Sequence, residues 1–72
     1  MNTDRINWDF DYHAPDEEKI RRHEDVRAGC RTLAHLFDRS APDSREKSLA
    51  ITKLEEALLW ANAAIARTPR PE

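Results

Sequence analysis

The chain of 72 residues contains one cysteine and one glycine, and each scarcity excludes a class of architecture. Because Cys30 has no second cysteine to pair with, no disulfide can form within one chain, and a lone thiol fits a reducing, intracellular compartment. The histidines His13, His23 and His35 lack the spacing of a zinc site, so we expect neither a metal nor a cofactor. With Gly29 as the sole glycine, tight β-hairpins and long flexible loops are not expected.

Long apolar runs are also missing. No stretch approaches the roughly 18–20 apolar residues of a membrane helix. The first residues, MNTDRINWDFDY, are acidic and polar where a secretory signal would be basic and then apolar. The expected localisation is therefore the cytoplasm, with no membrane partner. A formal net charge of -2 argues against a general DNA- or RNA-binding protein, although charged residues make up 36% of the chain and allow local basic patches.

The short length limits how stable a single copy can be. Chains of this size rarely bury enough apolar surface alone, and usually add disulfides, a metal or partner subunits. Since the first two are not expected here, the sequence predicts a homo-oligomer. Each copy would be one domain over residues 1–72, with an arm (1–14), two helices (15–39 and 43–67) and a frayed tail (68–72).

Apolar and polar residues alternate in the arm, where Ile6, Trp8, Phe10 and Tyr12 lie two residues apart. Period two is typical of an extended segment with one apolar face. No partner strand is evident in the sequence, so we predict an arm, extended or short-helical, that docks on a helical surface. These side chains would cover the core of the hairpin or of a neighbouring copy. Tyr12 carries a hydroxyl and is the one most open to another role.

The first helix is predicted to begin at Pro15, since proline suits the first helical turn. It must end before Pro42, because the residue preceding a proline is pushed out of helical geometry. One apolar stripe recurs along it at helical spacing: Ile20, Val26, Cys30, Leu33 and Phe37. The helix therefore offers a single apolar seam to a partner helix.

A second helix follows a short link. Either Asp43 or Ser44 can cap its first turn, and Asp43 with Glu46 forms the reciprocal capping pattern. It has an apolar seam of its own: Ile51, Leu54, Leu58, Ala61 and Ile65. Because a link of roughly four residues reverses the chain, the two helices run antiparallel. The predicted fold class is therefore all-α, an antiparallel two-helix hairpin with an N-terminal arm.

The second helix has further apolar residues outside this seam: Leu49, Leu59, Trp60, Ala63 and Ala64. In a two-helix hairpin most of them would meet water, and such a patch usually marks an interface. The small side chains among them allow another helix to approach closely. Self-association through this face is the prediction.

Catalytic chemistry finds little support in the sequence. Serine, histidine and acidic residues are present, but no nucleophile motif or phosphate-binding glycine loop surrounds them, and a hairpin offers no enclosed pocket. We therefore expect a binding protein and no enzyme. The basic residues of the two helices are either an ordinary solvated surface or phosphate contacts, for which the planar guanidinium of arginine is suited: Arg21, Arg22, Arg27, Arg31, Arg45, Lys47, Lys53 and Arg67. The Tyr12–His13 pair offers a ring face on which a nucleobase can stack.

Two segments resemble a known family: FDYHAP, from Phe10 to Pro15, and SREKSLAITKLEEALLWANAAIAR, from Ser44 to Arg67. They are similar to the phage hairpin-domain family of cyclic-nucleotide sponges, which includes the anti-CBASS sponges and a domain shared with the anti-Thoeris sponges. The resemblance implies a non-enzymatic protein of bacteriophage that evades host immunity by binding cyclic messengers and leaving them uncleaved, in the cytoplasm of the infected bacterium. It also implies a homohexamer with ligand pockets between subunits.

The resemblance also assigns residues. Tyr12, in the F-x-Y-H-x-P stretch, is implied to stack on a nucleobase, with His13 beside it. Arg27 is the best match for the basic residue that contacts a cyclic dinucleotide of the cyclic GMP-AMP type, and Arg31 is the second. Arg67 closes the A-N-A-A-I-A-R stretch and resembles the phosphate contact of a separate pocket for cyclic trinucleotides.

One departure from the family pattern concerns that second pocket. In studied relatives a small hydroxyl residue of the first helix accompanies the arginine, whereas Gly29 and Cys30 occupy this region here. An alternative function also stays open: a helical hairpin whose apolar second face binds a host or phage protein, without a small ligand. DNA binding would give affinity that falls steeply with salt, and the charge balance opposes it.

Overall fold

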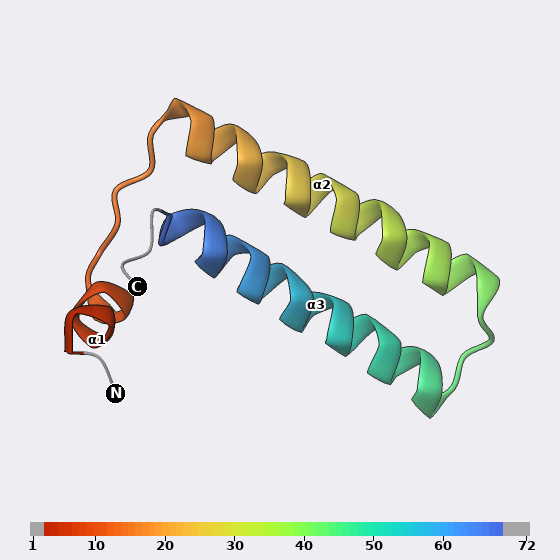
Figure 1. The fold of residues 1–72 in the computed structure, drawn as a ribbon. Coiled ribbons are helices and arrows are strands. Elements are labelled where there is room, and N and C mark those ends of the chain that lie inside the picture. Colours follow the sequence, from red (N-terminus) through yellow and green to blue (C-terminus); the bar gives the residue numbers. More distant parts are fainter. Residues whose placement is uncertain (1–2, 69–72) are drawn as a thin grey trace.

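The computed structural model describes residues 3–68, which form three helices and no strand. They are α1 (Thr3–Phe10), α2 (Glu17–Ser40) and α3 (Arg45–Ala66). Figure 1 shows α2 and α3 side by side and antiparallel, joined by a short turn, with α1 at the opposite, open end of the hairpin. The predicted all-α class is confirmed. Within the described part of the chain, no helix combines the length and apolarity that crossing a membrane requires.

The start of α2 is set by a side-chain cap. The Asp16 carboxylate accepts the backbone N–H of Lys19 at 2.8 Å, so Asp16 is the N-cap and the helix begins at Glu17. Pro15 lies one residue before the cap, and the prediction that it begins the helix is wrong. At the other end the N–H of Ala41 still bonds to the Phe37 carbonyl, which carries the helix to Ser40, one residue beyond the predicted end.

Ser44, and not Asp43, caps α3. Its hydroxyl accepts the N–H of Lys47 at 3.1 Å, and the helix begins at Arg45. Asp43 instead accepts from the Lys47 ammonium at 2.8 Å. The helix ends at Ala66 and Arg67 is its C-cap, so the predicted range 43–67 includes the flanking residues.

The predicted α3 seam faces α2: its five residues, from Ile51 to Ile65, are all half-buried. On α2, Val26, Cys30 and Phe37 are half-buried as well, but Leu33 is 38% exposed and Ile20 is 45% exposed. Ala34 takes the place predicted for Leu33. Leu33 and Ala34 lie on either side of the stripe on a helix of 3.6 residues per turn. Of the two, the small Ala34 is half-buried against α3.

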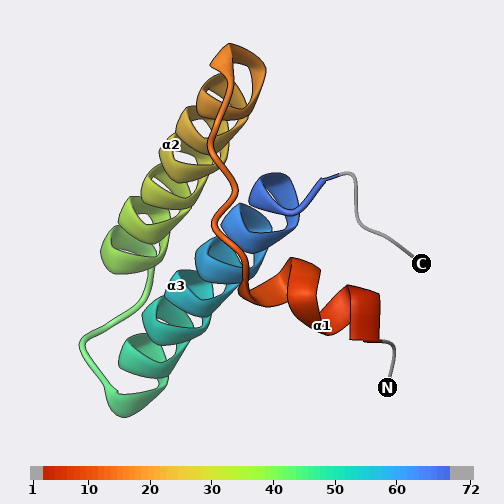
Figure 2. The same ribbon diagram turned by 90° about the vertical axis from the view of Figure 1, so that its left-hand side faces the viewer.

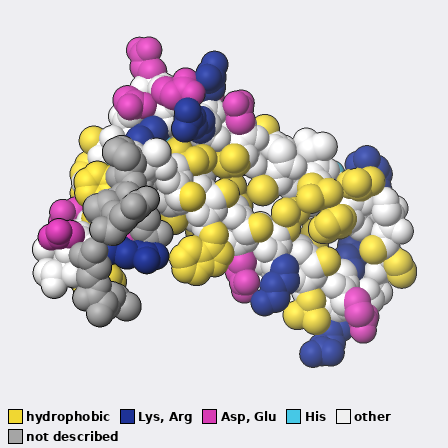
Figure 3. Space-filling model, viewed as in Figure 1, with side chains coloured by type: hydrophobic (Ala, Val, Ile, Leu, Met, Phe, Trp, Pro, Cys, Tyr) yellow, Lys and Arg dark blue, Asp and Glu magenta, His cyan; other side chains and the backbone are white. Residues whose placement is uncertain are grey.

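Two helices in one layer enclose no core. No side chain within residues 3–68 is fully buried. The molecule measures 46 × 30 × 16 Å, and its radius of gyration is 15.5 Å. A compact chain of this length would have a radius of gyration of about 11 Å. Figure 3 shows hydrophobic side chains lying open along the length of the hairpin. Each helix buries one stripe and leaves the rest of its apolar surface uncovered.

The arm is helical over residues 3–10, so its short-helical alternative is confirmed and the extended one is wrong for these residues. Figure 2 shows α1 to one side of α3, below its C-terminal turns, with a non-helical linker leading from it to α2. An eight-residue helix is not stable by itself, so tertiary contacts must hold it. The indole Nε1–H of Trp8 donates to the carbonyl of Arg67 at 2.7 Å, which ties α1 to the end of α3. The predicted frayed tail lies outside the described residues, except for Thr68.

Candidate functional site

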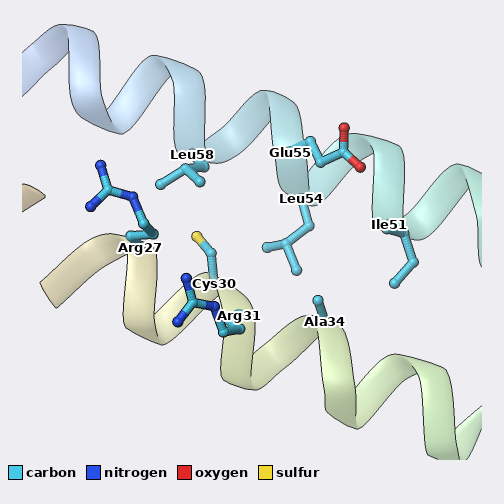
Figure 4. Close-up of a pocket in the computed structure, with 8 residues that line it drawn as sticks. All are labelled: Arg27, Cys30, Arg31, Ala34, Ile51, Leu54, Glu55 and Leu58. Carbon is cyan, nitrogen blue, oxygen red and sulfur yellow. The ribbon is translucent and has the colours of Figure 1, made fainter. Parts of the chain in front are cut away.

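A groove along the hairpin seam carries two of the predicted arginines. It has a volume of about 250 Å³ and is lined from both helices by Arg27, Cys30, Arg31, Ala34, Ile51, Leu54, Glu55 and Leu58. Figure 4 shows the side chains of Leu54, Leu58 and Cys30 between the helices, with Arg27 and Arg31 coming from α2. Because these arginines are four residues apart, they lie one helical turn from each other on the same face.

Arg27 and Arg31 differ from the arginines at the start of α2. Arg22 and Arg21 both bind Glu18, at 3.0 Å and 2.9 Å, and their hydrogen bonds and charge lower the pKa of its carboxyl. Within residues 3–68, neither Arg27 nor Arg31 forms an ion pair. Like charges one turn apart repel each other, so an anion bound to both would relieve that repulsion.

A second hollow meets the groove at the open end of the hairpin, and Arg27 lines both. Its volume is about 440 Å³, and its lining includes His13 from the linker, His23 from α2 and Asn62 from α3. The Nδ1 of His23 lies 2.8 Å from the Asn62 side-chain oxygen, and it donates, because an amide oxygen only accepts. The structure therefore brings the predicted residues His13 and Arg27 to one surface.

Tyr12 and His13 are neighbours in the linker but differ in their contacts. Tyr12 is 86% exposed and lines neither hollow, so its ring faces are open. His13 is half-buried, and its ring centroid lies 4.2 Å from that of Trp8. The Nε2 of His13 is 2.6 Å from the Trp8 carbonyl and must carry a hydrogen, since a carbonyl oxygen only accepts. Of the two rings, Tyr12 is therefore the one free to stack on a base.

Arg67 lies elsewhere, at the corner where α1 meets the end of α3. Its guanidinium donates to the Asp9 carbonyl at 3.2 Å, and its own carbonyl accepts from Trp8. It lines neither the seam groove nor the hollow that Arg27 shares with His13. The corner holds an open hollow of about 620 Å³ lined by Arg5, Asp9, Phe10, Trp60, Ala63, Ala64, Arg67 and Thr68. The predicted site residues thus divide between two surfaces.

Sequence reasoning missed two residues of the open end. Trp8 was predicted to cover a core, whereas its indole binds the end of α3, and Arg5 lines the corner hollow together with Arg67. One feature of the sequence could have predicted α1, the helix that carries these two residues. Arg5 and Asp9 are opposite in charge and four residues apart, a spacing typical of a helical surface.

The described residues contain no group of three or more His, Cys, Asp or Glu side chains arranged to hold a metal ion. What they present is an open helical surface with guanidinium groups and an exposed phenol ring. These features are typical of a small binding module for an anionic, aromatic ligand.

Comparison with protein families agrees with that class. The chain matches the Acb2/Tad1 hairpin domain over residues 2–66 and belongs to that family, the family of anti-CBASS and anti-Thoeris sponges. The family resemblance found in the sequence is thereby confirmed. Members of this family are known as binding domains of the sponge type rather than as enzymes. Searches of curated proteins and of solved structures gave no match.

Proposed function

We propose that the protein is a non-enzymatic phage anti-defence sponge that binds and sequesters cyclic dinucleotide immune messengers in the cytoplasm of the infected bacterium. Family membership supports the sponge role. The observation that supports the choice of ligand is the pair Arg27 and Arg31, two guanidinium groups on one face of α2 that form no ion pair within residues 3–68. A cyclic dinucleotide brings two phosphates to such a surface, and its bases need aromatic faces of the kind that Tyr12 offers.

The ligand site is proposed to lie between copies of the chain in a homo-oligomer, with the homohexamer as the expected assembly. The seam groove, at about 250 Å³, is smaller than the roughly 300–1,000 Å³ of typical ligand pockets. Leu59 is 69% exposed and Trp60 is 72% exposed on the outer face of α3, where a second copy would cover them. Symmetric copies would each supply one tyrosine and one pair of arginines to a ligand that is itself nearly symmetric.

A separate pocket for cyclic trinucleotides is proposed at the corner of α1 and α3. Arg67 lines its hollow of about 620 Å³, and Arg5 adds a second cation. The existing bond from Arg67 to the Asp9 carbonyl joins a cation to a neutral acceptor, which a phosphate can replace with a stronger charge-assisted bond. This assignment makes the corner and the seam two sites with different ligands.

Calorimetric titration of the purified protein with 3′,3′-cyclic GMP-AMP tests the function. We expect tight binding, a rise in melting temperature from linkage, and recovery of chemically intact ligand after heat denaturation. Linear pApG, which carries the same bases and an open backbone, serves as the control and should bind far more weakly. Absence of both heat and melting shift with the cyclic ligand would overturn the proposal, and recovery of cleaved product would overturn its non-enzymatic part.

A protein-interaction module without a small ligand is the alternative. The observation that favours it is apolar exposure at the corner, where Phe10 is 88% exposed beside Trp60. The two functions differ in whether they need the arginines of the seam groove: a sponge needs them, and an apolar docking surface does not. Replacing Arg27 and Arg31 together by glutamine should remove the activity of a sponge and leave an apolar docking surface intact. Protection of phage in cells that make a cyclic-nucleotide signal measures that activity.

A further inference from the structure

Trp8 makes three contacts that link the beginning and the end of the chain. Its indole Nε1–H donates to the carbonyl of Arg67 at 2.7 Å, and its backbone carbonyl lies 2.6 Å from the Nε2 of His13. Its ring also packs against the imidazole, with the two planes tilted by 45°. These contacts, which we name the Trp8 latch, join α1, the linker and the end of α3.

The bond to Arg67 uses an acceptor that a helix end leaves open. The last carbonyl groups of an α-helix have no partner within the helix. Here the Lys19 ammonium donates to the carbonyl of Ala66 at 3.3 Å, and Thr68 donates to that of Ala64 at 2.7 Å. The Arg67 carbonyl is the next in this series, and Trp8 supplies its donor. The anchor point of the latch is therefore fixed by the geometry of α3.

The latch is important for α1 because helix packing does not hold it in place. Within residues 3–68, close backbone packing between helices is confined to α2 and α3. Side chains therefore determine where α1 and the following linker lie, and the bonded atoms of Trp8 and Arg67 are 59 residues apart in the sequence. Without such an anchor, the linker would sample many conformations, and a ligand would have to order it on binding.

We infer that the Trp8 latch positions Tyr12 for ligand binding, with Trp8 as a positioning residue that acts through its neighbours without touching the ligand. Tyr12 lies between the two anchored positions: four residues after Trp8, and directly before His13, which the latch holds in place. This inference rests on the proposed function, since Tyr12 is there the base-stacking residue. It adds a residue of α1 to the site and makes the geometry of the linker a determinant of affinity.

The test compares two matched substitutions. Trp8→Phe keeps a ring against His13 and removes the N–H that binds Arg67, whereas the control Thr32→Val removes one polar hydrogen at an exposed position of α2 outside the proposed sites and interface. Titration with 3′,3′-cyclic GMP-AMP should show affinity on the order of fivefold weaker for Trp8→Phe, the size expected for one net hydrogen bond, and little change for Thr32→Val. Equal affinities for Trp8→Phe and the wild type would overturn the inference.

A double-mutant cycle separates positioning from general stability. If Trp8 acts through Tyr12, Trp8→Phe should have no further effect on affinity in a Tyr12→Ala background. A loss of the same size in both backgrounds would mean that Trp8 is merely structural. His13→Phe, which keeps the ring but removes the donor to the Trp8 carbonyl, provides a second variant if Trp8→Phe does not fold, and His13→Gln should restore part of the loss by supplying an amide N–H.

Hydrogen exchange of the amides of residues 7–11, which bond within α1 and to the Trp8 carbonyl, gives a readout that needs no ligand. The latch predicts faster exchange there in Trp8→Phe and unchanged exchange in Thr32→Val. If the wild type binds no cyclic nucleotide, the proposed function fails and the positioning role fails with it. If the wild type binds but Trp8→Phe affects neither affinity nor exchange, the positioning role alone fails.

Discussion

The two ends of the hairpin are held together by different kinds of interaction. At the turn, the ammonium of Lys47 bridges two carboxylates, Asp38 at 2.9 Å and Asp43 at 2.8 Å, beside the Ser44 cap. The lysine side chain is 12% exposed, whereas that of Asp43 is 99% exposed. Charge and a short connection close this end, and none of the predicted site residues lies there.

The open end has no covalent connection between the helices. Hydrogen bonds to backbone carbonyls are prominent there: Trp8 to Arg67, Arg67 to Asp9, His13 to Trp8 and Lys19 to Ala66. His13, Arg27 and Arg67 line hollows at this end, and Tyr12 directly precedes His13 in the linker between α1 and α2. The proposed function assigns recognition to this end, where helix termini leave polar groups without helical partners, and leaves the turn with a structural role. Four predictions test this division.

The largest effect is expected from a charge on the outer face of α3. Leu59→Glu should abolish ligand binding without removing a ligand contact, because a buried charge prevents a second copy from covering this face. Light scattering would report a monomer, and calorimetry would report no heat with 3′,3′-cyclic GMP-AMP. Glu56→Gln, also on α3, is the control and should keep assembly. A Leu59→Glu protein that still assembles and binds would place the interface elsewhere.

Removing the ring of Tyr12 comes next. Tyr12→Ala should weaken dinucleotide binding by about 1–3 kcal/mol, the range measured when a base loses an aromatic partner. Tyr12→Phe keeps the stacking face and should bind nearly as the wild type does. Because Tyr12 is 86% exposed in the single chain, the melting temperature without ligand should hardly change. Unchanged affinity of Tyr12→Ala would remove this residue from the site.

The third test separates the two surfaces of the open end. Arg67→Ala should weaken binding of a cyclic trinucleotide by roughly 1.5–3 kcal/mol, as expected for a bond to a charged group, and spare the dinucleotide. The carbonyl that Trp8 binds belongs to the backbone and remains in this variant. Parallel titrations with both ligands are the measurement. Equal losses would show that the corner and the seam form one site, or that Arg67 only supports α1.

The smallest effect is expected at the turn, as a pH-dependent change in stability. The hydrogen bond and charge of Lys47 lower the pKa of the Asp43 carboxyl, so the ionised form is favoured in the folded state. This contribution is present above the ordinary pKa of 3.8 and is lost as the pH falls through the lowered folded-state value. Asp43→Asn should therefore lower the melting temperature slightly at neutral pH, and the difference should vanish in strong acid.

The same ion cluster acts on the lysine with the opposite sign. Asp43 and Asp38 raise the pKa of Lys47 above 10.5, so its contribution is complete below that pH and is lost as the pH rises through the raised value. Throughout the neutral range, Asp43→Asn should leave ligand affinity unchanged, because the turn lies far from the site residues. A change in affinity would contradict the division between the two ends.

The sequence alone determined the helical class, the position of the turn and the inward face of α3, whose five predicted seam residues are all half-buried. These features follow from short-range rules: apolar spacing selects a helix face, and Pro42 with Ser44 defines where one helix stops and the next begins. The family match likewise rests on sequence.

Only the tertiary structure decided the state of residues 3–10 and the grouping of the site residues. Alternation predicted an extended segment there, whereas the structure has a helix whose Trp8 bonds to the carbonyl of Arg67, 59 residues away. The grouping of the site residues also depends on tertiary structure: Arg27 lines one hollow with His13, whereas Arg67 lines the corner hollow. Local periodicity predicts which face of each helix is buried. The contacts between α1 and the end of α3 join residues far apart in the sequence, so they depend on the geometry of the folded hairpin.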